Sequence, residues 1–290
     1  MAKENIVLME GYIEERPIIK VDKDGTAKVG EFKLTTLKRM HNNGTKIMPM
    51  EFSCPRVRTE NPDKIKVISK LKVGDYVRVK GTFSTKPVNK SKGCPECGTS
   101  NSVRGILSFV NLIFIDIIER DIFEEDGNGG LNKQKALEKL KSRSEVSNMF
   151  TCIGALVRDV DAYSDPERPN IHATRYQLAV NRKYLIKEDG PDVKTDYPNI
   201  ISYGKQAIQD AEQLQEGSVV YVNGFRRSKR VQRKFTCCNC GCVYNWIDPV
   251  LEVVPWGGVE FLFKNKDEIV DVKEYAEDKL SRYIAEYAEG

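Results

Sequence analysis

The chain of 290 residues has few of the side chains on which most enzymes depend. It has two histidines, His41 and His172, and it contains no H-E-x-x-H, no G-x-S-x-G and no phosphate-binding glycine loop. Asp116, Glu119 and Asp121 lie close together, but strand alternation places Asp116 on the face opposite the other two. The sequence therefore predicts a protein that is not an enzyme, and a metal-dependent nuclease is the enzymatic alternative.

Long apolar runs are also missing. The longest, 113–118, is interrupted by Asp116 and is far shorter than the ~20 residues that a membrane-spanning helix needs. The opening M-A-K-E-N-I-V-L passes directly into a strand pattern and offers no secretory signal. We therefore expect a cytoplasmic protein, in which closely spaced cysteines bind metal more often than they form disulfides.

One long internal repeat organises what is present. The segment L-Q-E-G-S-V-V-Y-V-N-G from Leu214 matches L-K-V-G-D-Y-V-R-V-K-G from Leu71, at a separation of 143 residues. The same separation relates the pairs Gly11 and Gly154, Cys94 and Cys237, and Cys97 and Cys240. A fixed period of this length indicates two copies of one domain, each with a C-x-x-C-G loop.

Both copies show the same order of predicted elements. In the first, strands are predicted at 6–15, 29–37, 46–53, 76–83 and 103–118, with a short helix that begins at Asn61-Pro62-Asp63. In the second, they are predicted at 149–159, 172–180, 197–203, 219–227 and 247–254, with a helix at 207–214. Residues 255–258 are expected to turn the chain into one further strand that ends at Phe263.

Three strands, a helix and two strands are the order of an oligonucleotide-binding (OB) barrel. We therefore predict an all-β fold with short helices: two tandem five-stranded OB barrels, each with a Cys-x-x-Cys knuckle loop after its fourth strand, and a C-terminal helix. The predicted boundaries are 1–121 for the first barrel, 122–147 for a linker with a basic helix, 148–264 for the second barrel and 265–290 for the C-terminal helix.

Three short segments of the second copy carry a family resemblance. F-T-C-I-G-A-L-V-R-D, Y-P-N-I-I-S-Y-G-K-Q-A and G-S-V-V-Y-V-N-G-F-R-R-S-K-R follow one another in the order of the first, third and fourth strands of a known barrel. Residues 148–254 thus resemble the bacterial and phage single-stranded DNA-binding protein family. The resemblance implies a protein that binds and protects single-stranded DNA with little sequence preference during replication or recombination.

The resemblance also implies where bases would stack. Three aromatic stacking positions of that family fall on Tyr184, Tyr197 and Tyr203, whereas in the first copy they map to Met40, Met48 and Cys54. Cations that contact phosphates normally accompany such rings. The predicted phosphate contacts are Arg182, Lys183, Arg226, Arg227, Lys229, Arg230, Arg233 and Lys234 in the second copy, with Arg78, Lys80 and Lys86 extending the track in the first. The alternative is that the tyrosines pack in the barrel and the charge run is a solvated hairpin.

The two C-x-x-C-G loops have the shape of zinc knuckles. Each supplies two thiolates, whereas structural zinc takes four ligands. A pseudo-twofold packing of the copies would bring Cys94, Cys97, Cys237 and Cys240 around one zinc ion and staple the two domains together. The alternatives are a site built from Cys237, Cys238, Cys240 and Cys242 alone, and free thiols in a mobile loop.

Other interpretations of the partner remain open. The ligand could be RNA, because OB barrels accept either kind of strand. The chain could instead be a zinc-stapled scaffold that recruits replication or recombination proteins through its C-terminal helix. The family resemblance further implies four cooperating barrels, which a two-barrel chain reaches as a homodimer, and the cytoplasm of a bacterial or phage-infected cell as the setting.

Overall fold

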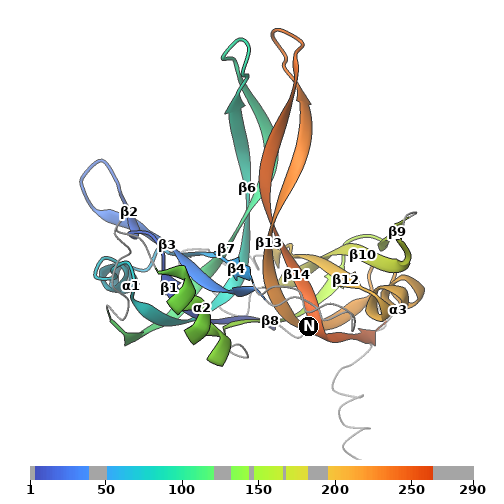
Figure 1. Ribbon diagram of the computed structural model, residues 1–290, viewed down its shortest axis with the longest axis horizontal. Helices are drawn as coiled ribbons and strands as arrows, with labels where there is room; N and C mark the ends of the chain where they lie inside the picture. The colour runs from blue at the N-terminus through green and yellow to red at the C-terminus, as the bar shows by residue number, and fades with distance from the viewer. Residues whose placement is uncertain are drawn as a thin grey trace, which may run out of the picture.

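Two barrels lie side by side, and two long hairpins rise together between them (Figure 1). The fold is a computed structural model that describes residues 4–38, 51–120, 132–143, 147–165, 168–181 and 195–263. The predicted C-terminal helix at 265–290 lies outside these residues. Within the described ranges, no helix is both long enough and apolar enough to cross a membrane.

The first barrel is closed by strands that are distant in sequence. Its elements are β1 (Asn5–Ile13), β2 (Ile18–Val21), β3 (Ala27–Lys38), β4 (Glu51–Ser53), β5 (Arg56–Thr59), α1 (Pro62–Ile68), β6 (Tyr76–Gly93) and β7 (Ser100–Glu119). β1 pairs with β3 and β6, β3 with β5, β5 in parallel with β7, and β7 with β6. The helix α1 begins where the Asn61 side chain accepts hydrogen bonds from the first turn, and Ile65 and Ile68 bury its inner face.

The second barrel repeats this closure. A helix, α2 (Lys133–Ser142), precedes it; its elements are β8 (Asn148–Leu156), β9 (Asp161–Asp165), β10 (Arg168–Asn181), β11 (Thr195–Asp196), β12 (Asn199–Tyr203), α3 (Lys205–Gln213), β13 (Val219–Thr236) and β14 (Val243–Phe263). β8 pairs with β10 and β13, β10 with β12, β12 in parallel with β14, and β14 with β13. The predicted tandem of OB barrels is confirmed.

The barrels are joined by one antiparallel ladder between β1 and β8. Val7 lies opposite Phe150, and these residues are 143 positions apart, so the centre of the ladder is also the centre of the repeat. The side-chain amide of Asn5 donates to the backbone carbonyl of Phe83 at 3.0 Å and accepts from its N–H at 2.8 Å. Asn148 makes the same pair of hydrogen bonds with the backbone of Arg226, at 2.7 and 3.2 Å. The two copies are therefore related by a pseudo-twofold axis that passes through this ladder.

The hairpins between the barrels are much longer than the sequence pattern predicts. β6 pairs with β7 as far as Gly93 and Ser100, and β13 with β14 as far as Thr236 and Val243. We call the hairpin arms 84–108 and 227–251, with the tips that they carry, the stalk. The outgoing arms are rich in charged and polar residues and show little of the apolar alternation that marks a half-buried strand, so the predicted fourth strands end near the barrel rim. The predicted fifth strands, 103–118 and 247–254, cover only part of the returning arms.

Two predicted elements were wrong in detail. The third strand of the first barrel is β5 rather than 46–53, of which only β4 at 51–53 lies within the described residues. Residues 255–258 do not turn the chain, because β14 continues through them with a register shift opposite Asn223 and Gly224. A Cβ at Gly224 would lie 2.3 Å from the carbonyl oxygen of Val254, so glycine is what allows this close approach.

Candidate nucleic-acid interface and metal cluster

Tyr203, at the end of β12, lies under an arginine of β13. The guanidinium carbon of Arg227 lies 5.1 Å from the centre of the Tyr203 ring, and its Nη2 donates to the tyrosine hydroxyl and, at 3.0 Å, to Glu252. Glu252 is buried, so its carboxylate fixes the arginine in place. Arg227 thus covers one face of the Tyr203 ring, which is half-buried.

Tyr197 lies at the other end of the same region, against the base of the stalk. Its side chain is 40% exposed, which leaves the ring accessible to a base. Its backbone N–H donates to the Thr85 hydroxyl at 3.1 Å, and its carbonyl accepts from the Gln177 amide at 3.4 Å. The loop that carries Tyr197 is therefore tied to both barrels, and the ring is held at their junction.

The predicted cations fall into groups with different environments. Four of them are exposed along one arm of the stalk, with Lys229 and Arg233 on one face of β13 and Arg230 and Lys234 on the other. Lys86, on the other hairpin, is also exposed, and Lys80 is half-buried. The structure thus places most of the predicted positive charge on the stalk, next to the second barrel rather than across the whole molecule.

Arg226 does not reach the surface. Its side chain is fully buried over the ring of Phe83 at 5.0 Å, and none of its three guanidinium nitrogens has a hydrogen-bond partner within the described residues. Burial lowers the pKa of this guanidinium to about 9. The prediction that Arg226 contacts phosphate was wrong, because strand alternation turns it inward while Arg227 faces outward.

Arg78 is exposed but has a structural partner. Its Nη2 lies 2.6 Å from the Glu10 carboxylate, which also accepts from Tyr76 and from Arg143 at the end of α2. This network, with Ala136 and Leu140 packed on Tyr12, Leu37 and Tyr76, docks α2 on the first barrel. The arginine is therefore engaged in the helix contact. Three other predicted residues, Arg182, Lys183 and Tyr184, lie outside the described residues.

Two residues that the sequence did not single out stand beside the predicted ones. Arg175 lies on the outward face of β10, two residues from Gln177. Trp246 lies directly opposite Arg233 across the second hairpin. The sequence held one signal for Trp246. Cys237 and Cys240 mark the tip of a hairpin, and counting the same number of residues back along both arms places Trp246 opposite the charge run.

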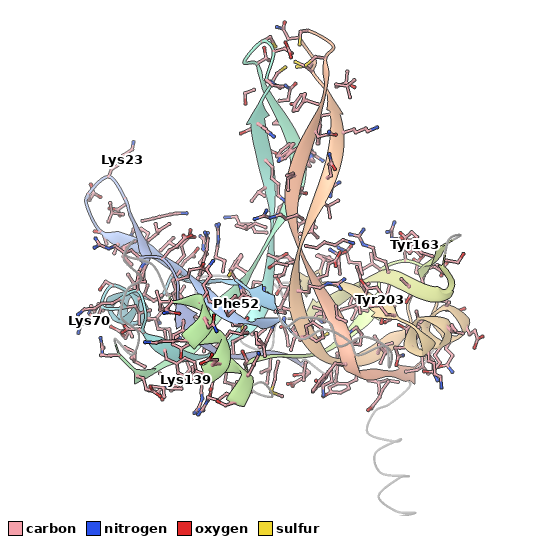
Figure 2. All side chains as sticks on the ribbon, in the orientation of Figure 1. Lys23, Phe52, Lys70, Lys139, Tyr163 and Tyr203 are labelled. Carbon is pink, nitrogen blue, oxygen red and sulfur yellow. The ribbon has the colours of Figure 1, made fainter. Side chains whose placement is uncertain are left out.

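The tips of the two hairpins bring four cysteines together (Figure 2). The sulfurs of Cys94, Cys97, Cys237 and Cys240 all lie within 4.8 Å of one another. In both tips the first cysteine's carbonyl accepts from a glycine N–H at 3.0 Å, that of Gly98 in one and of Gly241 in the other, and both glycines have φ near +70°. The knuckles are thus the same tight turn, facing each other across the pseudo-twofold axis.

The spacing of these sulfurs fits a tetrahedral ion. Zinc with Zn–S bonds of about 2.3 Å separates its sulfurs by about 3.8 Å. The observed S···S distances across the axis are 3.7 Å for Cys94 and Cys240 and 3.6 Å for Cys97 and Cys237. Backbone N–H groups of Cys240 and Asn239 lower the pKa of the Cys237 thiol, which favours the thiolate that binds metal. The donor set therefore suits one shared zinc ion.

The alternative metal site, built from the four cysteines of the second tip alone, does not form a cluster of sulfurs. Cys238 is exposed and is absent from the cluster. Cys242 lies 3.1 Å from Cys94, sulfur to sulfur, and occupies the position that Thr99 holds in the first copy. Cys242 is thus a neighbour of the cluster, and the four sulfurs that the repeat relates are the ones that surround a common centre.

Comparisons with known proteins agree with this architecture. Residues 147–236 match the model of the single-strand binding protein family. Two crystal structures of the Thermus aquaticus single-stranded DNA-binding protein, the wild type and a deletion mutant, are each 17% identical to this chain with a TM-score of 0.59. Each match covers 91% of this chain, together with 96% of the wild-type chain and 98% of the mutant chain. A Plasmodium falciparum relative solved with single-stranded DNA is 19% identical over 41% of this chain and 96% of its own, with a TM-score of 0.31, too low for an inference. No curated protein matches.

The structural likeness extends over both barrels, whereas the family match falls on the second. The matched residues begin just before β8 and end with β13, so they contain Tyr197, Tyr203 and the charged arm of the stalk. A family of binding proteins also agrees with the prediction of a chain that is not an enzyme. The chain is thus a tandem of two OB barrels, of which the second contains a segment that matches the single-strand binding protein family.

Proposed function

We propose that this protein binds single-stranded DNA with little sequence preference, and protects it during replication or recombination. The observation that carries the proposal is the match of residues 147–236 to the single-strand binding protein family, because that segment holds the exposed Tyr197 and the half-buried Tyr203 beside the cationic arm of the stalk. Rings and cations at one place are what a single strand needs: each stacked base contributes about 1–3 kcal/mol, and cations neutralise the phosphates.

The second barrel provides the main contact in this proposal. Its outward face offers Tyr197 at the junction with the stalk and Tyr203 held by Arg227. The exposed lysines and arginines of β13 lie next to that face, on both sides of the strand. A single strand of DNA that crosses the barrel therefore meets stacking surfaces first and the cations of the stalk next.

Binding should be strongly sensitive to salt. Each phosphate neutralised on a single strand contributes about 0.7 to the slope of log K against log salt concentration. Fluorescence polarisation of a labelled dT oligonucleotide, titrated at several salt concentrations, measures both the affinity and this slope. Failure to bind at low salt would end the proposal, and tighter binding to the matching RNA would reassign the ligand.

We further propose that the cysteine cluster holds one structural zinc ion. Cys94, Cys97, Cys237 and Cys240 would be its ligands, and the ion would supply a cross-link between the two hairpin tips. The site lies far from the barrel face along the stalk (Figure 1), so its role is to hold the hairpins together. Metal analysis of the purified protein tests this, with about one zinc per chain expected.

A further inference from the structure

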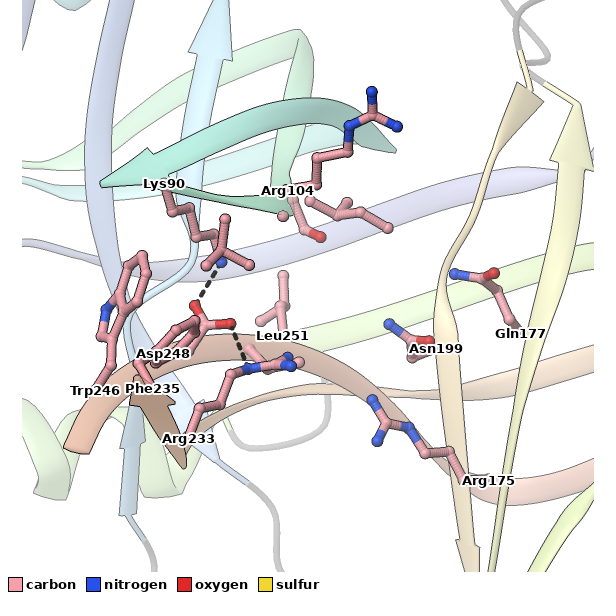
Figure 3. Close-up of a pocket in the computed structure, with 15 residues that line it drawn as sticks. Lys90, Arg104, Arg175, Gln177, Asn199, Arg233, Phe235, Trp246, Asp248 and Leu251 are labelled. Atoms are coloured by element: carbon pink, nitrogen blue, oxygen red, sulfur yellow. Dashed lines mark hydrogen bonds and ion pairs between the residues drawn. The ribbon is translucent and has the colours of Figure 1, made fainter. Parts of the chain in front are cut away.

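A cleft opens where the stalk meets the second barrel (Figure 3). It has a volume of about 260 Å³, just below the roughly 300–1,000 Å³ of sites for drug-sized ligands. Residues of both hairpins form one side, and residues of β10 and β12 form the other. The part of the lining used below is Lys90, Arg104, Arg175, Arg233, Phe235 and Trp246.

The stalk side of the cleft combines aromatic and charged groups. The rings of Phe235 and Trp246 lie 5.0 Å apart, centre to centre, and tilt by 48°, so they form one apolar wall. Beside them the Asp248 carboxylate bridges the hairpins, with Lys90 at 2.5 Å and Arg233 at 3.2 Å. The wall is therefore fixed by one ion pair within the second hairpin, Arg233 with Asp248, and by one that crosses from the first hairpin, Lys90 with Asp248.

The charge in the cleft is unbalanced. Four cationic side chains line it against one carboxylate, Asp248, which is already engaged by Lys90 and Arg233. Among the described residues, Arg104 and Arg175 have no ion-pair partner, and they approach the cleft from opposite sides (Figure 3). Each of these guanidiniums can attract an anion, and an arginine can bind phosphate through two hydrogen bonds.

The cleft is continuous with the barrel face of the proposed function. Asn199 and Gln177 line it, they lie opposite each other on β12 and β10, and the Gln177 amide donates to the carbonyl of Tyr197. Tyr197 is only two residues from Asn199, which lines the cleft. A single strand of DNA that stacks on Tyr197 therefore lies next to the mouth of the cleft.

We propose that this cleft is a subsite for one nucleotide of the bound single strand. The base lies against Trp246 and Phe235, and the phosphates on its two sides lie against Arg175 and Arg104. The proposal rests on the proposed function and deepens it, because it makes the stalk a wall of the binding site. A pyrimidine nucleotide of DNA is the ligand class on which it is tested.

The first barrel does not repeat this subsite. The position of Arg175 is occupied there by Glu31, which is buried and lies 3.6 Å from Arg56. The positions of Trp246 and Phe235 are occupied by Val103 and Lys92. The subsite therefore exists once per chain, and it gives the bound strand a fixed place between the two barrels.

The test separates contact from stability by using the two tryptophans of the chain. In a Trp256→Phe background, Trp246 is the only tryptophan, and a dT oligonucleotide should quench its fluorescence in parallel with the polarisation titration. An oligonucleotide that carries 5-iodouracil should photocross-link to Trp246 or Phe235, as located by mass spectrometry. Binding without quenching, together with cross-links confined to other residues, would overturn the subsite.

Affinity measurements complete the test. Trp246→Ala should weaken dT binding about 5- to 100-fold, whereas Trp246→Phe should retain most of the affinity because it keeps a ring. The matched control is Ile247→Ala, since Ile247 is the next residue and is 56% exposed outside the cleft. Arg104→Ser should lower the salt slope by about 0.7.

The outcomes distinguish the two proposals. If no variant and no wild-type protein binds dT at low salt, the proposed function fails and the subsite fails with it. If the wild type binds and Trp246→Ala binds equally well, the function stands and the subsite fails.

Discussion

The two barrels share a scaffold but not a surface. Both close through the same strand pairs, and in both a glycine of the fourth strand, Gly81 or Gly224, allows a backbone carbonyl within 2.4 Å of where a Cβ would be. On the outward face, however, Cys54 and Glu60 of the first barrel occupy the positions of Tyr197 and Tyr203. The difference shows that the barrel is retained by its core and bulges, while the stacking residues are free to change.

The first barrel has a structural partner of its own. The Glu10 carboxylate on β1 accepts hydrogen bonds from Arg78, Tyr76 and Arg143, and so fixes α2 against the barrel. Ile153, which cannot make these bonds, holds the equivalent position in the second copy. The comparison thus assigns docking of a helix to one barrel and, in the proposed function, contact with the ligand to the other. Each of the following experiments changes one side of that contrast.

The largest effect is expected at the one place where the two copies act together. Cys94→Ser or Cys237→Ser should reduce bound zinc from about one per chain to nearly none, because either change leaves three ligands. Metal analysis after dialysis against a weak chelator measures this. Cys242→Thr, which installs the residue of the first copy, should keep the metal. Loss of metal in that variant would place the site within the second tip alone.

The next effect concerns the outward faces. Tyr197→Ala and Tyr203→Ala should each weaken binding of a dT oligonucleotide about 5- to 100-fold, since each removes a stacking surface. Glu60→Ala, at the matching position of the first barrel, should leave the affinity unchanged. Polarisation titrations of all three variants at one salt concentration make the comparison. Equal losses in the two barrels would mean that both faces bind DNA.

A smaller effect is expected where the two copies face each other at the base of the stalk. Arg226 and Phe83 are equivalent residues in contact, and only one of them carries a charge. Arg226→Met removes an unpaired buried guanidinium and should raise the free energy of unfolding by about 1–2 kcal/mol, because desolvation outweighs the cation–π contact. Denaturant unfolding provides the measurement. A lower unfolding free energy would show that the contact dominates.

The smallest effect is a pH dependence confined to the first barrel. Burial opposes ionisation of Glu10, but hydrogen bonds from Arg143, Arg78 and Tyr76 outweigh it and lower the pKa of the carboxyl from its ordinary value of 4.5. The stabilisation is therefore complete above that value and is lost as pH falls through the lower folded pKa. The free energy of unfolding should fall more between pH 6 and pH 3 in the wild type than in Glu10→Gln. An equal fall in both proteins would contradict the prediction.

Much of the fold could be predicted because the chain carries it twice. The repeat aligned glycines and cysteines that the structure places at equivalent turns, and so it predicted the tandem barrels and the meeting of Cys94 with Cys237. The stalk could not be predicted in full, because its outgoing arms are dominated by charged and polar residues and show little apolar periodicity. The alignment of Tyr203 with Cys54 was wrong for a related reason: β5 is only four residues long, too short to show its register.

The candidate site was predicted in part for reasons that are specific to its residues. Tyr197 and Tyr203 were found through the family resemblance, and neither is buried, as a stacking role requires. Arg226 was misassigned because a run of charges conceals strand alternation: neighbours in sequence point to opposite sides. The cleft between the stalk and β10 depends on tertiary packing alone, so neither Arg104 nor Arg175 carried a local signal.

The ladder between β1 and β8 has a consequence for assembly. Because each of these strands already has hydrogen-bonded neighbours on both sides, the backbone groups at the centre of the molecule cannot recruit a strand from a second copy. Any higher-order complex must therefore form through another surface.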